Sequence, residues 1–153
     1  MSNARIVVAS LSLSAAALVG IATYEGYRSD AYMDVVGVPT IGFGETKGVR
    51  AGDKTEPVRA LVTLLDSAER HADGVRSCIK VPLYPHEFSA YVSLAYNIGV
   101  GAFCGSTLVK LLNQKRYAEA CQQILRWDKA GGRQVRGLTL RRQAEYRTCT
   151  GAD

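Results

Sequence analysis

The sequence has few of the residues that usually hold a metal ion. Histidine occurs only twice, at His71 and His86, and the four cysteines form no C-x-x-C pair. Neither pattern has the ligand spacing of a zinc site. A basic arm or a nucleic-acid-binding motif is also missing, since the basic residues are spread along the chain. We therefore expect no metal, no cofactor and no nucleic-acid partner.

The composition excludes a disordered chain. Charged residues make up 22% of the 153 residues and hydrophobic ones 47%, as in a globular protein. This length corresponds to about one domain, which can bury a sizeable core. The formal net charge of +5 favours anionic partners, such as acidic lipid headgroups or a polyanionic cell-wall polymer.

Charge is absent from one long stretch near the N-terminus. Met1 to Arg5 form a positive flank, and the run from Ile6 to Thr23 contains no ionisable side chain. The run lies at the lower edge of the ~20 residues that cross hydrocarbon as a helix. The positive flank predicts that the N-terminus stays inside while the rest of the chain is exported. More than half of the run is Ala, Ser, Gly or Thr, so we expect its membrane residence to be marginal.

Three interpretations of this run are open on its residues alone. The run can be a cleaved signal peptide, because "VGIA" before Thr23 places small residues at suitable positions. It can be a permanent anchor, although its weak hydrophobicity argues against that. Finally, it can be an exporting segment that later leaves the bilayer and joins the fold. The choice depends on what the following residues require.

A carboxylate, Glu25, follows the apolar run almost directly, and Gly26 breaks the helical pattern. The next segment, "VVGVPTIGFG" (35–44), mixes β-branched and turn residues, as in the short strands of a hairpin. The chain therefore turns back after the helix, so that Asp34 and Thr40 can face Glu25 across a cleft. Two facing carboxylates suit glycoside hydrolysis. A lone Glu and Asp are more often surface charges, so the pair by itself is weak evidence.

The surrounding pattern is more specific. The motif E-G-x(7)-D-x(5)-T-I-G-x-G, from Glu25 to Gly44, resembles the catalytic motif of the bacteriophage lysozymes, the endolysins of glycoside hydrolase family 24. Downstream, "SLAYNIGVGAF" resembles the central helix of that family, and "GLTLRR" resembles part of its last helix. The resemblance runs from about Thr23 to the end. One departure is Glu45, where many relatives carry His, so a local ion pair of that His is expected to be absent.

The resemblance implies a muramidase. Such an enzyme cleaves the β-1,4 bond between N-acetylmuramic acid and N-acetylglucosamine in peptidoglycan, with inversion. Glu25 is then the general acid, while Asp34 and Thr40 hold the attacking water. Two alternatives belong to other classes: a lytic transglycosylase, which needs no water-holding Asp, and a wall-binding protein without activity.

Four further residues are candidates for the same site. Tyr32 and Asn97 can line the glycan cleft, although a position in the core or in support of the cleft is the more ordinary interpretation of each. Arg141 or Arg142 is expected to pair with the catalytic acid, because an arginine of the family is similar in position. Such a pair favours the ionised form of the acid, so we interpret it as an orienting contact.

The resemblance also implies a mostly helical α+β fold, with a glycan cleft between a small β-hairpin lobe and a helical lobe. We expect residues 1–23 to form an N-terminal helix and residues 24–153 the catalytic domain. Within that domain, 24–55 holds the end of the catalytic helix and the hairpin, and 56–153 is the helical lobe. Helical patterns follow a period of 3.6 or have start and stop signals; they cover 56–79, 85–99, 106–114, 116–127 and 137–149.

The cysteines suit an exported enzyme, in which an even number forms disulfides. Cys121 and Cys149 lie on the last two long helices, which should pack as neighbours. Cys78 ends one helix and Cys104 starts another. We therefore predict the pairs Cys121–Cys149 and Cys78–Cys104. Four reduced thiols in a cytosolic protein would be the alternative without export.

The resemblance also bears on the apolar run. A lysozyme of this type has about three helical turns before its catalytic Glu, and cleavage after "VGIA" would leave none. The run is therefore expected to be that helix, as in signal-anchor-release endolysins. We expect export to the periplasm, a transient tether to the inner membrane through residues 6–23 with the N-terminus cytoplasmic, and then a soluble monomer acting on peptidoglycan. The tethered form is expected to be inactive.

Overall fold

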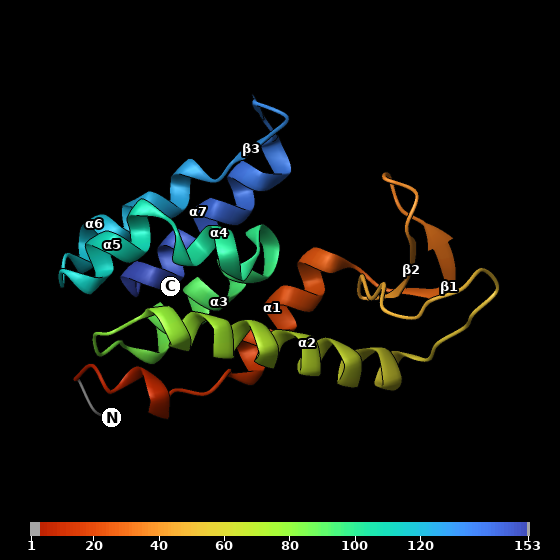
Figure 1. Ribbon diagram of the computed structural model, residues 1–153, viewed down its shortest axis with the longest axis horizontal. Helices are drawn as coiled ribbons and strands as arrows, with labels where there is room; N and C mark the ends of the chain where they lie inside the picture. The colour runs from red at the N-terminus through yellow and green to blue at the C-terminus, as the bar shows by residue number, and fades with distance from the viewer. Residues whose placement is uncertain (1–3, 153) are drawn as a thin grey trace.

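The computed structural model describes residues 4–152. It has the predicted mostly helical α+β fold, in which helices form one lobe and a small antiparallel hairpin stands apart from them (Figure 1). Helix α2 (Pro57–Cys78) runs from the hairpin region to the helical lobe, and α1 (Ala15–Glu25) lies between the two parts. The end of α1 is therefore the place where both lobes meet.

Helix α1 occupies only the second half of the apolar run. Ser14 caps it by accepting a 3.1 Å hydrogen bond from the backbone N–H of Ala17, and Gly26 ends it at φ +69°. The residues before Ser14 are extended except for a short turn, η1 (Val8–Ser10). The helix expected over residues 1–23 is thus wrong before Ala15, because the serine side chain supplies a cap; residues 1–3 lie outside the described part. Between residues 4 and 152, no helix is long and apolar enough to cross a bilayer.

The extended residues 4–14, called here the N-terminal strap, are bound to the helical lobe. Ile6 and Leu83 exchange two backbone hydrogen bonds of 2.9 Å, and the carbonyl of Leu11 accepts bonds of 3.0 and 2.7 Å from Arg76. The side chains of Val8 and Leu11 are buried in the core. The strap is therefore an integral part of the folded protein.

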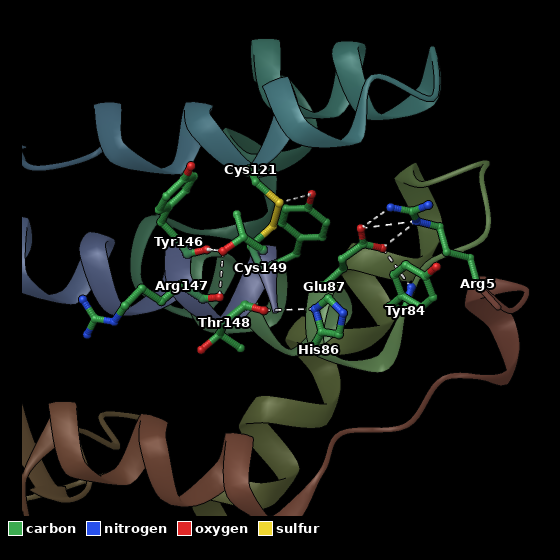
Figure 2. Close-up of a disulfide and its surroundings, with 11 residues drawn as sticks. Arg5, Tyr84, His86, Glu87, Cys121, Tyr146, Arg147, Thr148 and Cys149 are labelled. Carbon is green, nitrogen blue, oxygen red and sulfur yellow. Dashed lines mark hydrogen bonds and ion pairs between the residues drawn. A yellow bond between two sulfur atoms is a disulfide. The ribbon is translucent and has the colours of Figure 1, made fainter. Parts of the chain in front are cut away.

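Arg5 anchors the beginning of the strap. Its guanidinium donates to the carboxylate of Glu87, at distances down to 2.8 Å, and lies over the ring of Tyr84 (Figure 2). It also lies over the ring of Tyr117. Glu87 is buried and also accepts a 2.8 Å bond from the backbone N–H of Tyr84. The residue that forms the positive flank of the apolar run is thus paired inside the folded molecule.

The hairpin consists of β1 (Arg28–Met33) and β2 (Pro39–Gly42), in which Tyr32 faces Thr40. The predicted hairpin is present, but its first strand lies earlier than expected. Val35 and Val36, predicted as strand, instead form the exposed turn, because Asp34 accepts hydrogen bonds from this turn and closes it.

The helical lobe is built around α3 (Pro85–Ile98), much of which is buried. Pro57 and Pro85 start α2 and α3 at positions where a missing N–H costs nothing. The remaining elements are α4 (Val100–Cys104), α5 (Thr107–Asn113), α6 (Tyr117–Gln123), η2 (Ile124–Arg126), the two-residue strands β3 (Lys129–Ala130) and β4 (Arg133–Gln134), and α7 (Arg136–Thr150). The sequence did not predict α4 or the β3–β4 hairpin, because each is very short.

The two predicted disulfides are both present. Cys78–Cys104 joins α2 to α4, and Cys121–Cys149 joins α6 to α7 (Figure 2). Both bonds lie within the helical lobe, and neither involves α1 or the strap. The helical lobe is therefore cross-linked independently of the apolar run.

Candidate active site

Glu25 is the last residue of α1, and its side chain is 25% exposed. Its Oε1 accepts a 3.3 Å hydrogen bond from Nη1 of Arg141 on α7. On its other side lies Gly44, from the segment after β2, where a methyl group would stand 3.5 Å from Oε2 of Glu25. The helix end thus places one carboxylate between the helical lobe and the segment that follows the hairpin.

Arg141 is the predicted orienting arginine, and it is buried. Besides Glu25, it donates to Oε1 of Glu145 at 3.2 Å and to the backbone carbonyl of Ser93 at 3.3 Å. Its guanidinium also stands over the ring of Tyr24, 4.5 Å from the centroid. These contacts with α1, α3 and α7 fix the position of the group that touches Glu25.

Arg142, the other predicted arginine, does not contact Glu25. It donates a 2.9 Å hydrogen bond to Oδ1 of Asn97 and lies 2.9 Å from Oε2 of Glu145. Burial lowers the pKa of Arg142, because desolvation penalises its charged form. Asn97, a predicted cleft residue, is thus held by α7.

Glu145 connects the two arginines, and we did not predict it. This carboxylate is buried between Arg141 and Arg142 and accepts a 2.7 Å bond from the hydroxyl of Ser93. Burial raises the pKa of Glu145, against the opposing effect of both arginines and of Ser93. The sequence carried one signal, the spacing R-R-x-x-E, which places all three charges within one helical turn of each other.

Asp34 and Thr40 lie at the two ends of the hairpin turn. Oδ1 of Asp34 accepts bonds from the backbone N–H groups of Val36 and Val38, at 2.9 and 2.8 Å. Its Oδ2 has no hydrogen bond within residues 4–152. Thr40 is buried, and its hydroxyl donates to the carbonyl of Val38 at 2.9 Å, which leaves its oxygen lone pairs available. Both residues therefore keep an acceptor that can bind water.

A cavity of about 690 Å³ has Gly44, the neighbour of Glu25, in its wall, whereas Glu25, Asp34 and Thr40 are not among its lining residues. It lies between the segment after β2 and one face of α2, with Glu45 and Tyr96 in its wall. Burial raises the pKa of Tyr96, and the nearby carboxylates of Glu25 and Glu45 add to this increase. Neither Tyr32 nor Asn97 lines this cavity: the ring of Tyr32 lies under the guanidinium of Arg28, and Asn97 pairs with Arg142 as described.

Glu45, the departure from the family pattern, forms hydrogen bonds with the residues that directly follow it. Its Oε1 accepts bonds from the backbone N–H groups of Thr46 and Lys47, at 2.9 and 2.6 Å. Within the described chain it makes no salt bridge. Likewise, residues 4–152 contain no group of three or more His, Cys, Asp or Glu placed to share a metal ion.

Gly44 allows a first prediction. Its φ of +89° disfavours a side chain, and a methyl group there would lie in van der Waals contact with Oε2 of Glu25. Gly44→Ala should cost about 1–2 kcal/mol of stability and lower kcat/KM on the order of tenfold, because relief of the backbone strain shifts the segment that touches Glu25. Gly52→Ala is the matched control, because Gly52 has φ +88° with open space around it. Equal activities of the two variants, measured on peptidoglycan, would contradict the placement of Gly44 beside the acid.

Sequence comparison finds related proteins over most of the chain. Residues 22–145 match the family model of phage lysozyme, a range that begins before Glu25 and ends at Glu145. The SAR-endolysin of Pseudomonas phage phiKMV is 41% identical over 140 residues, which cover 88% of this chain and 86% of that protein.

Solved structures with the same fold are found as well. An endolysin from Escherichia coli O157:H7 phage FAHEc1 matches with a TM-score of 0.85 and 33% identity, covering 94% of this chain and 96% of that one. The muramidase domain of SpmX from Asticaccaulis excentricus also reaches 0.85, at 28% identity, covering 91% and 97%. The chain therefore belongs to the phage lysozyme family, whose members are glycoside hydrolases that lyse peptidoglycan.

Proposed function

We propose that this protein cleaves the β-1,4 bond between N-acetylmuramic acid and N-acetylglucosamine, with Glu25 as the general acid. The observation that carries this proposal is the position of Glu25, which ends α1, contacts the buried Arg141 and lies next to Gly44 in the cavity wall. The similarity to a structure named as a muramidase domain supports the same bond. Peptidoglycan glycan strands are then the substrate.

The proposed reaction is a single displacement. Glu25 gives its proton to the glycosidic oxygen, which leaves as a hydroxyl group. A water molecule held by Oδ2 of Asp34 and the hydroxyl of Thr40 attacks the anomeric carbon from the opposite face, and Asp34 takes up its proton. Inversion follows, and it requires carboxyl groups about 6.5–9.5 Å apart so that the water fits between them.

The products of digestion test this function. Purified peptidoglycan treated with the protein should yield reducing N-acetylmuramic acid ends, because water is the attacking group. Ends of the 1,6-anhydro form would identify a lytic transglycosylase instead. Binding of peptidoglycan without any new ends would identify a wall-binding protein.

We infer that the protein is a periplasmic endolysin that starts as an inactive, membrane-tethered form. The relative named as a SAR-endolysin supports this inference, since it aligns over most of both chains. In the membrane-tethered form, residues 6–23 lie in the bilayer as a helix, so the strap and α1 do not pack on the helical lobe. The core then lacks Val8, Leu11 and Ile21, and Glu25 has no fixed position.

Arg5 adds a specific contact to this transition. While the run spans the bilayer, Arg5 stays on the cytoplasmic side, and the carboxylate of Glu87 has no arginine beside it. Release brings Arg5 between Glu87 and the rings of Tyr84 and Tyr117, so the folded form is favoured once the run has left the membrane.

A further inference from the structure

The charges around Glu25 form a chain of contacts through the helical lobe. Starting from Glu25, Arg141 follows at 3.3 Å, Glu145 lies 3.2 Å from Arg141, and Arg142 lies 2.9 Å from Glu145. Asn97 is the last residue in this series of contacts, 2.9 Å from Arg142. One buried carboxylate, Glu145, thus sits between the two arginines that contact the catalytic acid and Asn97.

We propose that Glu145 is a positioning residue for catalysis, because it holds Arg141 and Arg142 in place and shares the positive charge of Arg141 with Glu25. The proposal rests on the proposed function of Glu25 as general acid. A fully charged arginine facing Glu25 alone would favour the ionised carboxylate and hinder proton donation. Glu145 opposes that effect, since its negative charge lies against the same guanidinium.

Other ionisable groups lie on the elements around Glu25. Arg141 on α7 contacts it, Tyr96 on α3 is affected by its charge and by that of Glu45, and Tyr24 on α1 lies under Arg141. Glu145 and Arg142 on α7 follow Arg141 in the series of contacts. Of these, only the two arginines are cationic, and both contact Glu145. Glu145 is therefore placed to balance the positive charge that acts on the acid.

The pair of Arg142 and Glu145 leaves buried polar atoms poorly satisfied, which costs stability. Nε and Nη1 of Arg142 and Oε2 of Glu145 are buried without a well-aligned hydrogen bond in the described part of the chain, although Nε and Oε2 lie 2.9 Å apart. Such groups carry a desolvation penalty, and apolar residues of similar size are often at least as stable. Local rules of stability are commonly broken where function requires it. This favours a role in the site over a purely structural one.

The test is the pH dependence of kcat/KM, whose basic limb reports the catalytic acid of the free enzyme. Glu145→Gln should move this limb to lower pH by about one unit, and activity above the limb should fall about tenfold. Arg141→Gln should move it the opposite way. Glu145→Asp, which keeps the charge, should restore most of the wild-type profile, and Ser93→Ala, which removes only a neutral hydrogen bond to Glu145, should leave the limb in place.

A purely structural role predicts a different pattern. If Glu145→Gln lowers activity equally at every pH, or if both charge variants move the limb in the same direction, the proposal is overturned. Should Glu145→Gln fail to fold, Arg141→Gln and Glu145→Asp decide, and an unmoved limb in Arg141→Gln overturns it. Failure here leaves the function of Glu25 intact, whereas full activity of Glu25→Gln would remove that function itself.

Discussion

Replacing Glu25 by Gln is expected to lower the rate of peptidoglycan hydrolysis by ~10³-fold, because the glycosidic oxygen loses its proton donor. The fold should persist, since Glu25 is partly exposed and the amide oxygen can still accept the bond from Arg141. The loss is measured as the release of reducing ends from purified peptidoglycan, and thermal unfolding reports the integrity of the fold.

Glu119→Gln is the matched control for this change. Glu119 is exposed and pairs with Arg116 far from the catalytic motif, so the same chemical substitution should leave the rate unchanged. Asp34→Asn is a second test. It should abolish the activity of a hydrolase, which needs this carboxylate to hold the water, and spare that of a transglycosylase, which does not. Hydrolysis by Glu25→Gln at the wild-type rate would contradict the assignment of the acid.

The second large effect concerns the apolar run. A chain that begins at Thr23, exported behind a cleavable signal peptide, is expected to lack both activity and a cooperative unfolding transition. The truncation removes Val8, Leu11 and Ile21 from the core and leaves Glu25 without a helix. Activity equal to that of the full chain would show that the run serves export alone.

A pair of point variants separates packing from membrane insertion. Ile21 is 0% exposed and Val19 is 61% exposed, although both are apolar residues of α1. Ile21→Ala should cost about 2–5 kcal/mol of stability in the released protein. Val19→Ala should stay within about 0.5 kcal/mol. The two changes make the run less apolar in a similar way, so equal losses of stability would contradict the packed position of α1.

The sequence predicted the elements whose signals are local. The 3.6-residue period predicted the helix over 56–79, Pro85 marked the start of the next one, and Gly26 marked the end of the helix that carries Glu25. The two disulfides followed from the expected neighbours among the helices. In contrast, the long apolar run predicted a single helix, whereas the cap at Ser14 divides it into strap and helix.

Contacts between distant parts of the chain were harder to predict. The pair of Glu25 and Arg141 spans 116 positions, and only the family resemblance suggested it. Glu145 was missed because its partners come from α3 as well as from its own helix. The 3.6-residue period of α2 also includes apolar residues that are not buried: Leu64 lies in the core, whereas Val58 and Leu65 are exposed.

The central claim is that leaving the membrane and assembling the active site are one event. It is tested most directly by comparing the hydrolytic activity per molecule of the full-length protein in the membrane fraction and in the soluble fraction, before and after membrane depolarisation. We predict an inactive membrane fraction and an activity that rises in proportion to the released protein. Equal activity per molecule in both fractions would contradict the claim.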